Sequence, residues 1–251
     1  MRLLVHGMQS SGATAFTLFL AQRPGCLALV DVLNNYAAPR VETPLDMVVK
    51  TVVTTAYPLA VHAERFRPDR TLLLLRDPRD NYRSLRNKHY RNHSGLIHEK
   101  FALLELLFTE RARFDAVVHY EDFVARDPAV FATLDRLGWP VQESFYEYRR
   151  RHEELAGALW RHVPDLFEHM EFAFGNVQGR SVSDKFLDKP KDPDPDQLLN
   201  ELCPCLLAHY RDRPEERGHA GQAREGRLPE RGGRPRQENG FSQGICFGEG
   251  G

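Results

Sequence analysis

Residues 7–14 have the types and spacing that bind a phosphate group. They read Gly-Met-Gln-Ser-Ser-Gly-Ala-Thr and directly follow a short run that begins with Leu3-Leu4-Val5. Glycines let the backbone turn tightly, and the unpaired N–H groups at the start of a helix face an anion. The residues expected to bind the anion are Gln9, Ser10, Ser11, Gly12, Ala13 and Thr14. The alternative is a tight turn between a strand and a helix that binds nothing.

The same loop fits the first part of the Walker A pattern, Gly-x-x-x-x-Gly-Lys-Ser/Thr, through Gly7 and Gly12. Ala13 stands where that pattern has its phosphate-binding lysine, which argues against an ordinary ATP or GTP hydrolase. A P-loop kinase or nucleotidase with a replaced lysine stays open as an alternative. Such an enzyme needs acids for its metal ion. Asp77 and Asp80 are available, but no apolar strand ends in a convincing acid of this kind.

A second polar group of residues follows the apolar run Leu72–Leu75. Arg76 lies at the expected carboxyl end of that strand, where doubly wound sheets bind their ligands. A guanidinium there can hold a phosphate through two hydrogen bonds, and Ser84, two turns into the expected helix, adds a hydroxyl donor. Taken alone, residues 76–80 fit equally well to a surface turn whose arginines pair with its own acids.

The elements that must position these residues alternate between short apolar runs and longer amphipathic ones. Short runs rich in β-branched residues are typical of buried parallel strands, and the amphipathic runs have helical spacing. The expected strands are Leu3–His6, Leu27–Val32, Met47–Val53, Thr71–Leu75 and Ala116–His119. The expected helices between them are Thr14–Gln22, Tyr57–Arg65, Arg79–Tyr90 and Leu96–Arg113. The alternation predicts an α/β fold with a doubly wound, mostly parallel sheet and flanking helices.

The second half of the chain is expected to be helical and then to lose its order. Asp127 and Pro128 are typical of a helix N-cap followed by proline at the first helical position. Further helices are expected near Glu143–Leu155 and Gly157–Phe174. Residues 211–251 are rich in glycine and charge and poor in large apolar groups, so we expect a disordered tail after one domain at 1–210.

The overall composition and charge limit the kinds of binding partner that the chain is expected to have. The formal net charge is −1, so no global field attracts nucleic acid or an acidic membrane, and an anion site must be local. No apolar run is long enough for a signal peptide or a membrane span. Cys26, Cys203, Cys205 and Cys246 have neither zinc-site spacing nor a dense disulfide pattern. We therefore expect a cytoplasmic protein without a metal, and the oligomeric state is not readable.

Together these motifs resemble those of the PAPS-dependent sulfotransferases, as in a bacterial-type or divergent member. Residues 7–14 resemble the family motif Gly-x-x-Arg/Lys-Ser-Gly-Thr-Thr, and Arg76 and Ser84 match its second motif, an arginine followed eight residues later by serine. Residues 118–123, Val-His-Tyr-Glu-Asp-Phe, are similar to its Tyr-Glu-Asp-Leu segment, and Gly179-Arg180-Ser181 is a weaker echo of its Arg-Lys-Gly cofactor loop.

The resemblance implies a P-loop-like fold and a sulfuryl transfer from PAPS (3′-phosphoadenosine 5′-phosphosulfate) to a hydroxyl or amine of a small-molecule or glycan acceptor. It implies that the first loop binds the 5′-phosphosulfate and that Arg76 and Ser84 bind the 3′-phosphate. Tyr120 would border the adenine, and Arg180 would belong to the cofactor site. Packing at the end of a strand is the alternative for Tyr120.

Two departures from the family pattern change the expected chemistry. Ser10 replaces the usual Arg or Lys of the loop, and Val52 replaces the histidine of the family's Lys-Thr-His sequence. Lys50 is then the expected source of positive charge. Asp31, at a strand end, resembles the carboxylate base of bacterial and tyrosylprotein sulfotransferases, and His6 is adjacent to the loop. The further histidine candidates are His62, His89 and His93. A degenerate family member that binds nucleotide without catalysis is the remaining alternative.

Overall fold

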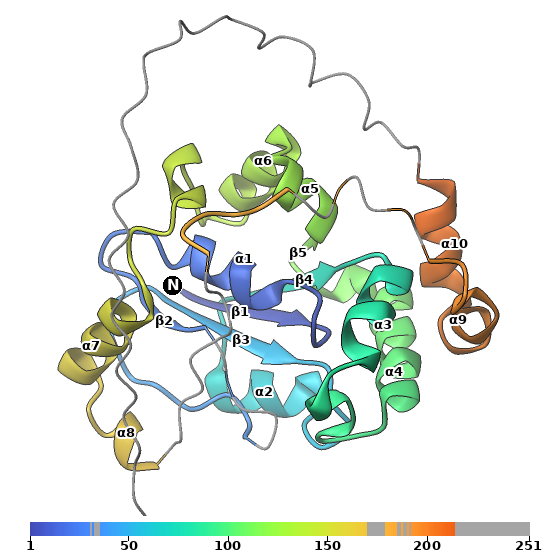
Figure 1. Ribbon diagram of the computed structural model, residues 1–251. Coiled ribbons are helices and arrows are strands. Elements are labelled where there is room, and N and C mark those ends of the chain that lie inside the picture. Colours follow the sequence, from blue (N-terminus) through green and yellow to red (C-terminus); the bar gives the residue numbers. More distant parts are fainter. Residues whose placement is uncertain are drawn as a thin grey trace, which may run out of the picture. The chain divides into compact units, whose positions relative to one another are not determined.

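A parallel sheet forms the centre of the chain. The structure is a computed structural model that describes residues 1–30, 32, 36–169, 179–184, 187, 190 and 192–213. The strands are β1 (Arg2–Gly7), β2 (Leu27–Leu29), β3 (Met47–Val52), β4 (Arg70–Leu75) and β5 (Ala116–His119). They form one five-stranded sheet in the order β2-β3-β1-β4-β5, and every neighbouring pair is parallel (Figure 1). The expected doubly wound α/β fold is confirmed.

The order of the strands sets the place of the site. The chain puts β2 and β3 on one side of β1 and then β4 and β5 on the other. Ligands of doubly wound sheets bind beyond the carboxyl ends of the strands, where the strand order reverses. In this sheet that place lies next to the carboxyl end of β1, and the loop at residues 7–14 begins there.

Helices cover both faces of the sheet (Figure 1). On one face α1 (Ala13–Leu20), α5 (Tyr120–Ala125) and α6 (Pro128–Arg136) share a core with Leu3 and Val5 of β1. The other face packs on α2 (Leu59–Phe66), α7 (His152–His162) and α8 (Leu166–His169) around Leu4, and on α4 (Ile97–Thr109) around Leu73. Successive strand residues point to opposite faces, so both faces demand apolar side chains and the strands read as apolar runs.

The remaining elements are short. The helix expected at Arg79–Tyr90 is α3 (Pro78–Arg86) followed by the 3-10 turn η1 (His89–Asn92), and α4 is followed by η2 (Arg111–Arg113). The chain continues with η3 (Glu143–Tyr146) and ends its described part with α9 (Asp196–Leu202) and α10 (Pro204–Asp212). Asp127 caps α6 as expected, because its Oδ1 accepts a hydrogen bond of 2.7 Å from the N–H of Ala129. The tail expected at 211–251 begins too early, because Arg211 and Asp212 still belong to α10. Residues 214–251 lie outside the described residues.

The helix expected near Glu143–Leu155 is wrong. The chain forms η3, leaves the helical path, and begins α7 only at His152. The reason is tertiary: the guanidinium of Arg150 donates to the backbone carbonyls of Ala21, Arg23 and Cys26. The helix expected at Gly157–Phe174 is also interrupted, since α7 ends at His162, two residues before Pro164. Residues 170–174 lie outside the described part.

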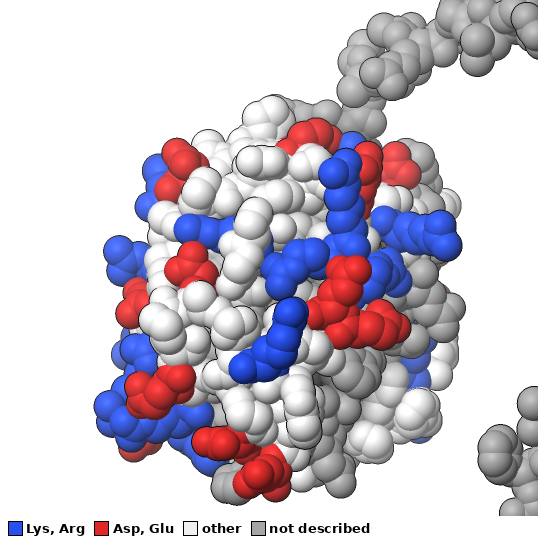
Figure 2. Space-filling model, turned by 90° about the vertical axis from the view of Figure 1, so that its left-hand side faces the viewer, with Lys and Arg blue, Asp and Glu red and all other residues white. Residues whose placement is uncertain are grey.

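Charged side chains of both signs share the face that carries α7. Figure 2 shows lysines and arginines interspersed with aspartates and glutamates there rather than gathered by sign. The formal net charge of −1 is consistent with this mixture. A site for an anion must therefore be built from particular donors, which the carboxyl ends of the strands supply.

Candidate functional site

The loop after β1 is an open helix N-terminus. Ser10 (φ 61°) and Gly12 (φ 91°) both adopt the left-handed backbone region that turns the chain sharply into α1. Gly12 is the N-cap, no side chain among the described residues caps the helix, and its first turn contains no acidic residue. The first N–H groups of a helix have no partner within it, and the helix dipole is positive at this end. The loop therefore presents a site suited to an anion.

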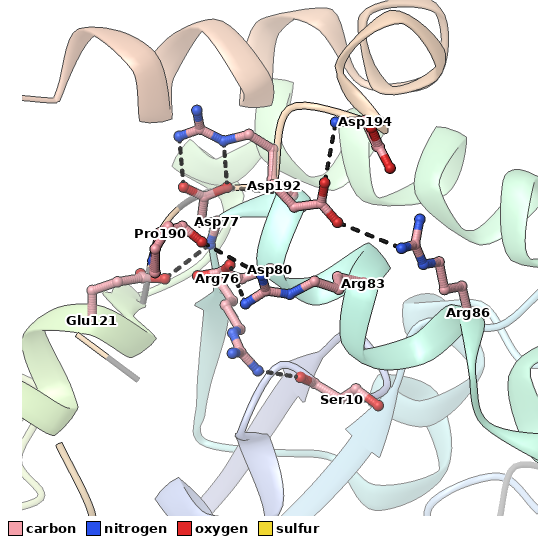
Figure 3. Close-up of polar contacts among 11 residues, drawn as sticks. Ser10, Arg76, Asp77, Asp80, Arg83, Arg86, Glu121, Pro190, Asp192 and Asp194 are labelled. Carbon is pink, nitrogen blue, oxygen red and sulfur yellow. Dashed lines mark hydrogen bonds and ion pairs between the residues drawn. The ribbon is translucent and has the colours of Figure 1, made fainter. Parts of the chain in front are cut away.

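Three buried side chains hold the loop by its oxygen atoms. Arg76 Nη1 donates to the carbonyl of Ser10 over 2.8 Å (Figure 3). Asn81 Nδ2 donates to the carbonyl of Gln9 over 2.6 Å, and Lys100 Nζ donates to Oε1 of Gln9 over 2.8 Å. Because all three contacts use oxygens, they fix the loop without consuming its N–H groups.

Tyr120 packs directly against the loop. A Cβ atom placed on Gly12 would lie 2.2 Å from Cε2 of Tyr120, so only glycine fits at this position. The guanidinium carbon of Arg76 lies 4.7 Å from the centroid of the same ring. Burial raises the pKa of Tyr120, so its hydroxyl stays protonated at neutral pH. Tyr120 thus lies at the loop, next to Arg76.

Lys50 also reaches the loop. It lies on β3, and its Nζ donates to Oγ1 of Thr14 in the first turn of α1 over 3.2 Å. Its side chain is buried, on the sheet face that packs against α1. A cation at the positive end of a helix dipole becomes favourable when an anion lies between them. Lys50 and Arg76 therefore place two cationic side chains beside the same loop.

His6 lies on the opposite face of the sheet. Its Nδ1 is 2.8 Å from Oγ1 of Thr51, and its ring centroid is 6.0 Å from that of His62 on α2. Burial, with a smaller effect of His62, lowers the pKa of His6 to about 3. Burial lowers the pKa of His62 to about 4, and His62 Nδ1 accepts a hydrogen bond from the N–H of Ala38. Both rings are neutral at pH 7 and have buried polar partners, as structural histidines do.

The turn from β4 into α3 has features of both interpretations of its sequence, the self-paired turn and the anion site. Asp77 caps α3 and accepts two hydrogen bonds, of 3.0 and 2.8 Å, from the guanidinium of Arg79. Asp80 pairs with Arg83 at 3.4 Å (Figure 3), so these acids do pair with nearby arginines, but both acids are buried and do not form a surface turn. Arg76 instead turns to the loop. Arg76 lines a shallow, partly open crevice with Asp80, Tyr120, Glu121, Val124 and Leu187.

The other expected site residues are placed as follows. The Oγ of Ser11 is buried and has no hydrogen-bond partner among the described residues. Ser84 is half-buried on α3. Arg180 is exposed, and its segment is held by the bond from the N–H of Val182 to the carbonyl of Tyr146. Asp31 lies outside the described residues.

Two residues of the site had not been expected from the sequence. Asn81 lies on the buried stripe of α3 between Pro78 and Leu85, and Lys100 lies four residues before the buried Leu104 of α4. A polar side chain at an apolar position of the helical repeat is the signal that marks both, because such a side chain must find a buried partner. The sequence does not say that the partner is Gln9.

Within the part of the chain that the structure describes, no group of three or more His, Cys, Asp or Glu side chains is arranged to hold a metal ion. Among the same residues, no helix has the length and apolar character needed to cross a membrane.

The comparisons with known proteins find similarity among solved structures. No family model matches the chain, and the comparison with curated proteins gave no match. Among solved structures, the chain is similar to the mouse sulfotransferase SULT7A1 complexed with PAP, with a TM-score of 0.42 and 13% sequence identity over 86% of each chain. A similarity of this degree says nothing about the activity of the chain.

Proposed function

We propose that this chain is a PAPS-dependent sulfotransferase that acts on a hydroxyl or amine of a small-molecule or glycan acceptor. One observation carries the proposal. The uncapped N-terminus of α1 meets two cationic side chains, Lys50 at Thr14 and Arg76 at Ser10. The motifs at residues 7–14 and 76–84, read from the sequence, favour PAPS over other phosphorylated ligands.

The residues present fit a phosphosulfate group. Ser11 offers a buried hydroxyl without a partner among the described residues, and the first turn of α1 offers N–H groups that no side chain caps. Bound PAPS supplies an activated sulfuryl group. The loop N–H groups and Thr14 would hold its 5′-phosphosulfate, and Lys50 would stabilise negative charge on the leaving oxygen. Arg76 and Ser84 bind its 3′-phosphate.

Asp31 is the proposed general base. It follows β2, and Leu29 at the end of β2 pairs with Val49, the residue before Lys50. His6 is less suited, because a pKa of about 3 makes its imidazole a weak base and its ring packs on the face of the sheet opposite α1. Val52, at the family's histidine position, is buried and has no group that transfers a proton.

The kinase alternative is disfavoured by the acids that it would need. Asp77 accepts hydrogen bonds from Nε and Nη2 of the Arg79 guanidinium, and Asp80 pairs with Arg83. A carboxylate that holds a metal ion would have to give up these partners. Magnesium-dependent binding of ATP would nevertheless support this alternative and contradict the proposal.

Titration calorimetry with 3′,5′-ADP tests the cofactor assignment. We expect the unmodified protein to bind this nucleotide and Arg76→Ala to weaken the affinity by roughly tenfold to a hundredfold, as loss of a charged hydrogen-bond donor does. Arg70→Ala is the matched control, because Arg70 lies exposed at the amino end of the same strand. It should bind as the unmodified protein does. Failure of the unmodified protein to bind contradicts the proposal.

Transfer of radioactive sulfate from labelled PAPS to a panel of phenols, amines and glycans tests the activity. We expect a labelled product that depends on Lys50 and Asp31. Binding of 3′,5′-ADP without transfer to any acceptor would instead favour a nucleotide-binding protein without catalytic activity.

A further inference from the structure

Lys100 is a fully buried lysine beneath the phosphate loop. Its side chain has 0% exposure, and it lies on α4, far from Gln9 in the sequence. Its Nζ donates to Oε1 of Gln9 over 2.8 Å and to the carbonyls of Arg91 and His93 over 3.1 and 2.6 Å. An ammonium group has three protons, and these acceptors use all of them.

The acceptors of Lys100 are all neutral. Among the described residues, no carboxylate forms a hydrogen bond or ion pair with it. Its neighbour Glu99 instead accepts a hydrogen bond of 2.8 Å from the N–H of Leu96 at the start of α4. A buried cation whose hydrogen-bond acceptors are all neutral is costly, and an anion nearby lowers that cost. Glu99 acts on Lys100 in this sense only through space, and its effect on the pKa is smaller than that of burial.

The loop supplies no charge of its own. Residues 7–14 contain no lysine, arginine or histidine side chain, although the site is suited to an anion of high charge. Gln9 is the loop residue that Lys100 holds, and its carbonyl is fixed by Asn81 at the same time. Only the side chain of Gln9 therefore separates the ammonium of Lys100 from the loop backbone.

We propose that Lys100 is a positioning residue that acts through Gln9 and gives the phosphate loop the positive charge that its own side chains lack. The inference rests on the proposed function, because the anion it serves is the 5′-phosphate of the cofactor. Burial lowers the pKa of Lys100 to about 8, so the ammonium is still mostly charged at pH 7. The same lysine ties the segment of Arg91 and His93 to the loop.

Binding of two nucleotides that differ by one phosphate tests the proposal. The unmodified protein should bind 3′,5′-ADP more tightly than 3′-AMP. In Lys100→Met, this preference should fall by at least about tenfold, because a charge acts over a few ångströms on the 5′-phosphate alone. Lys100→Arg keeps the charge and should keep most of the preference.

Asn81→Ala is the matched control. It removes a neutral contact to the carbonyl of the same Gln9 and leaves the charge in place. A purely structural role of Lys100 predicts equal losses of preference in Lys100→Met and Asn81→Ala, and that result would overturn the inference. So would an unchanged preference in Lys100→Met. The comparison of these two variants decides the matter even if Lys100→Arg fails to fold.

The proposed function and this inference fail in different ways. If the unmodified protein binds neither nucleotide, the proposed cofactor is wrong. Pyrophosphate then serves as the probe of the loop, with unfolding temperature as the readout. Stabilisation by pyrophosphate that Lys100→Met abolishes and Asn81→Ala retains would support the inference, whereas any other pattern would overturn it.

Discussion

The two ends of helix α1 contrast sharply. At the carboxyl end, Arg150 donates to the carbonyl of the C-cap Ala21 and to those of Arg23 and Cys26 in the turn that follows, at 2.7 to 2.9 Å. Trp139 Nε1 donates to the carbonyl of Leu20 over 3.3 Å. At the amino end, no side chain from the described part of the chain caps the first turn. The carbonyls at one end have partners within the protein, and the N–H groups at the other end are left to a ligand.

The difference between the two ends of α1 separates residues that stabilise the fold from residues that bind a ligand. The terminal groups of a helix need partners from outside the helix. Where the protein provides them, as at Arg150, removal of the partner is expected to reduce stability. Where it instead places Lys50 and Arg76 nearby, removal of the cation is expected to reduce affinity for an anion. Each end of α1 can be tested with its own variant and its own measurement.

The largest effect is expected at the carboxyl end. Arg150→Ala leaves three backbone carbonyls without their charged donor and should lower the free energy of unfolding by about 4 kcal/mol. Urea denaturation measures the loss. Arg149→Ala is the control, since Arg149 is exposed and pairs with the exposed Glu147 at 3.4 Å, and it should cost less than about 1 kcal/mol. Equal effects of the two variants would contradict a structural role for this end.

Gly12→Ala should lower the free energy of unfolding by about 3 kcal/mol. The new methyl group would lie 2.2 Å from the Tyr120 ring, and the left-handed φ adds strain of about 1 kcal/mol. Gly25→Ala is the control: Gly25 has φ 73°, but no atom lies within 4 Å of the added Cβ. The difference between the two variants isolates the contact with Tyr120. If they cost the same, Tyr120 does not pack on the loop in solution.

Lys50→Met should weaken the binding of 3′,5′-ADP by roughly tenfold to thirtyfold, equivalent to about 2 kcal/mol. The methionine keeps the apolar part of the buried side chain and removes the charge beside Thr14. Titration calorimetry measures the affinity. Lys88→Met, in the segment between α3 and η1, is the control and should bind normally. An unchanged affinity in Lys50→Met would show that the amino end of α1 does not rely on this cation.

The sequence predicts the sheet well because the sheet is buried on both faces. Leu72–Leu75 and Met47–Val49 must be apolar whichever face they meet, so the runs are continuous and easy to find. The helix predicted across residues 147–151 does not form, for the opposite reason. Their helical spacing is a local property, and the carbonyls that Arg150 binds lie more than a hundred positions earlier in the chain.

The site shows the same division. The loop and Arg76 are found from residue types at fixed local spacing, and the structure brings them together at 2.8 Å. Lys100 and Asn81 contact Gln9 from 91 and 72 positions away in the sequence, and no local sequence pattern predicts such contacts. The side chain of His6 follows the alternation of β1 to the face opposite α1, although its neighbour Gly7 begins the loop.

The smallest effect is expected on that opposite face, where His6 is neutral when folded. Its pKa falls from 6.5 to about 3, so between these values the unfolded chain binds more protons than the folded one. Stability is therefore lost as the pH drops below 6.5. His6→Asn removes this titration and should reduce the loss of unfolding free energy between pH 6.5 and 5 by about 1.6 kcal/mol. Urea denaturation at the two pH values measures it, with the exposed His98 replaced by Asn as the control. A His6 that titrates near 6.5 would instead leave this loss unchanged and would return His6 to the list of candidate bases for the loop.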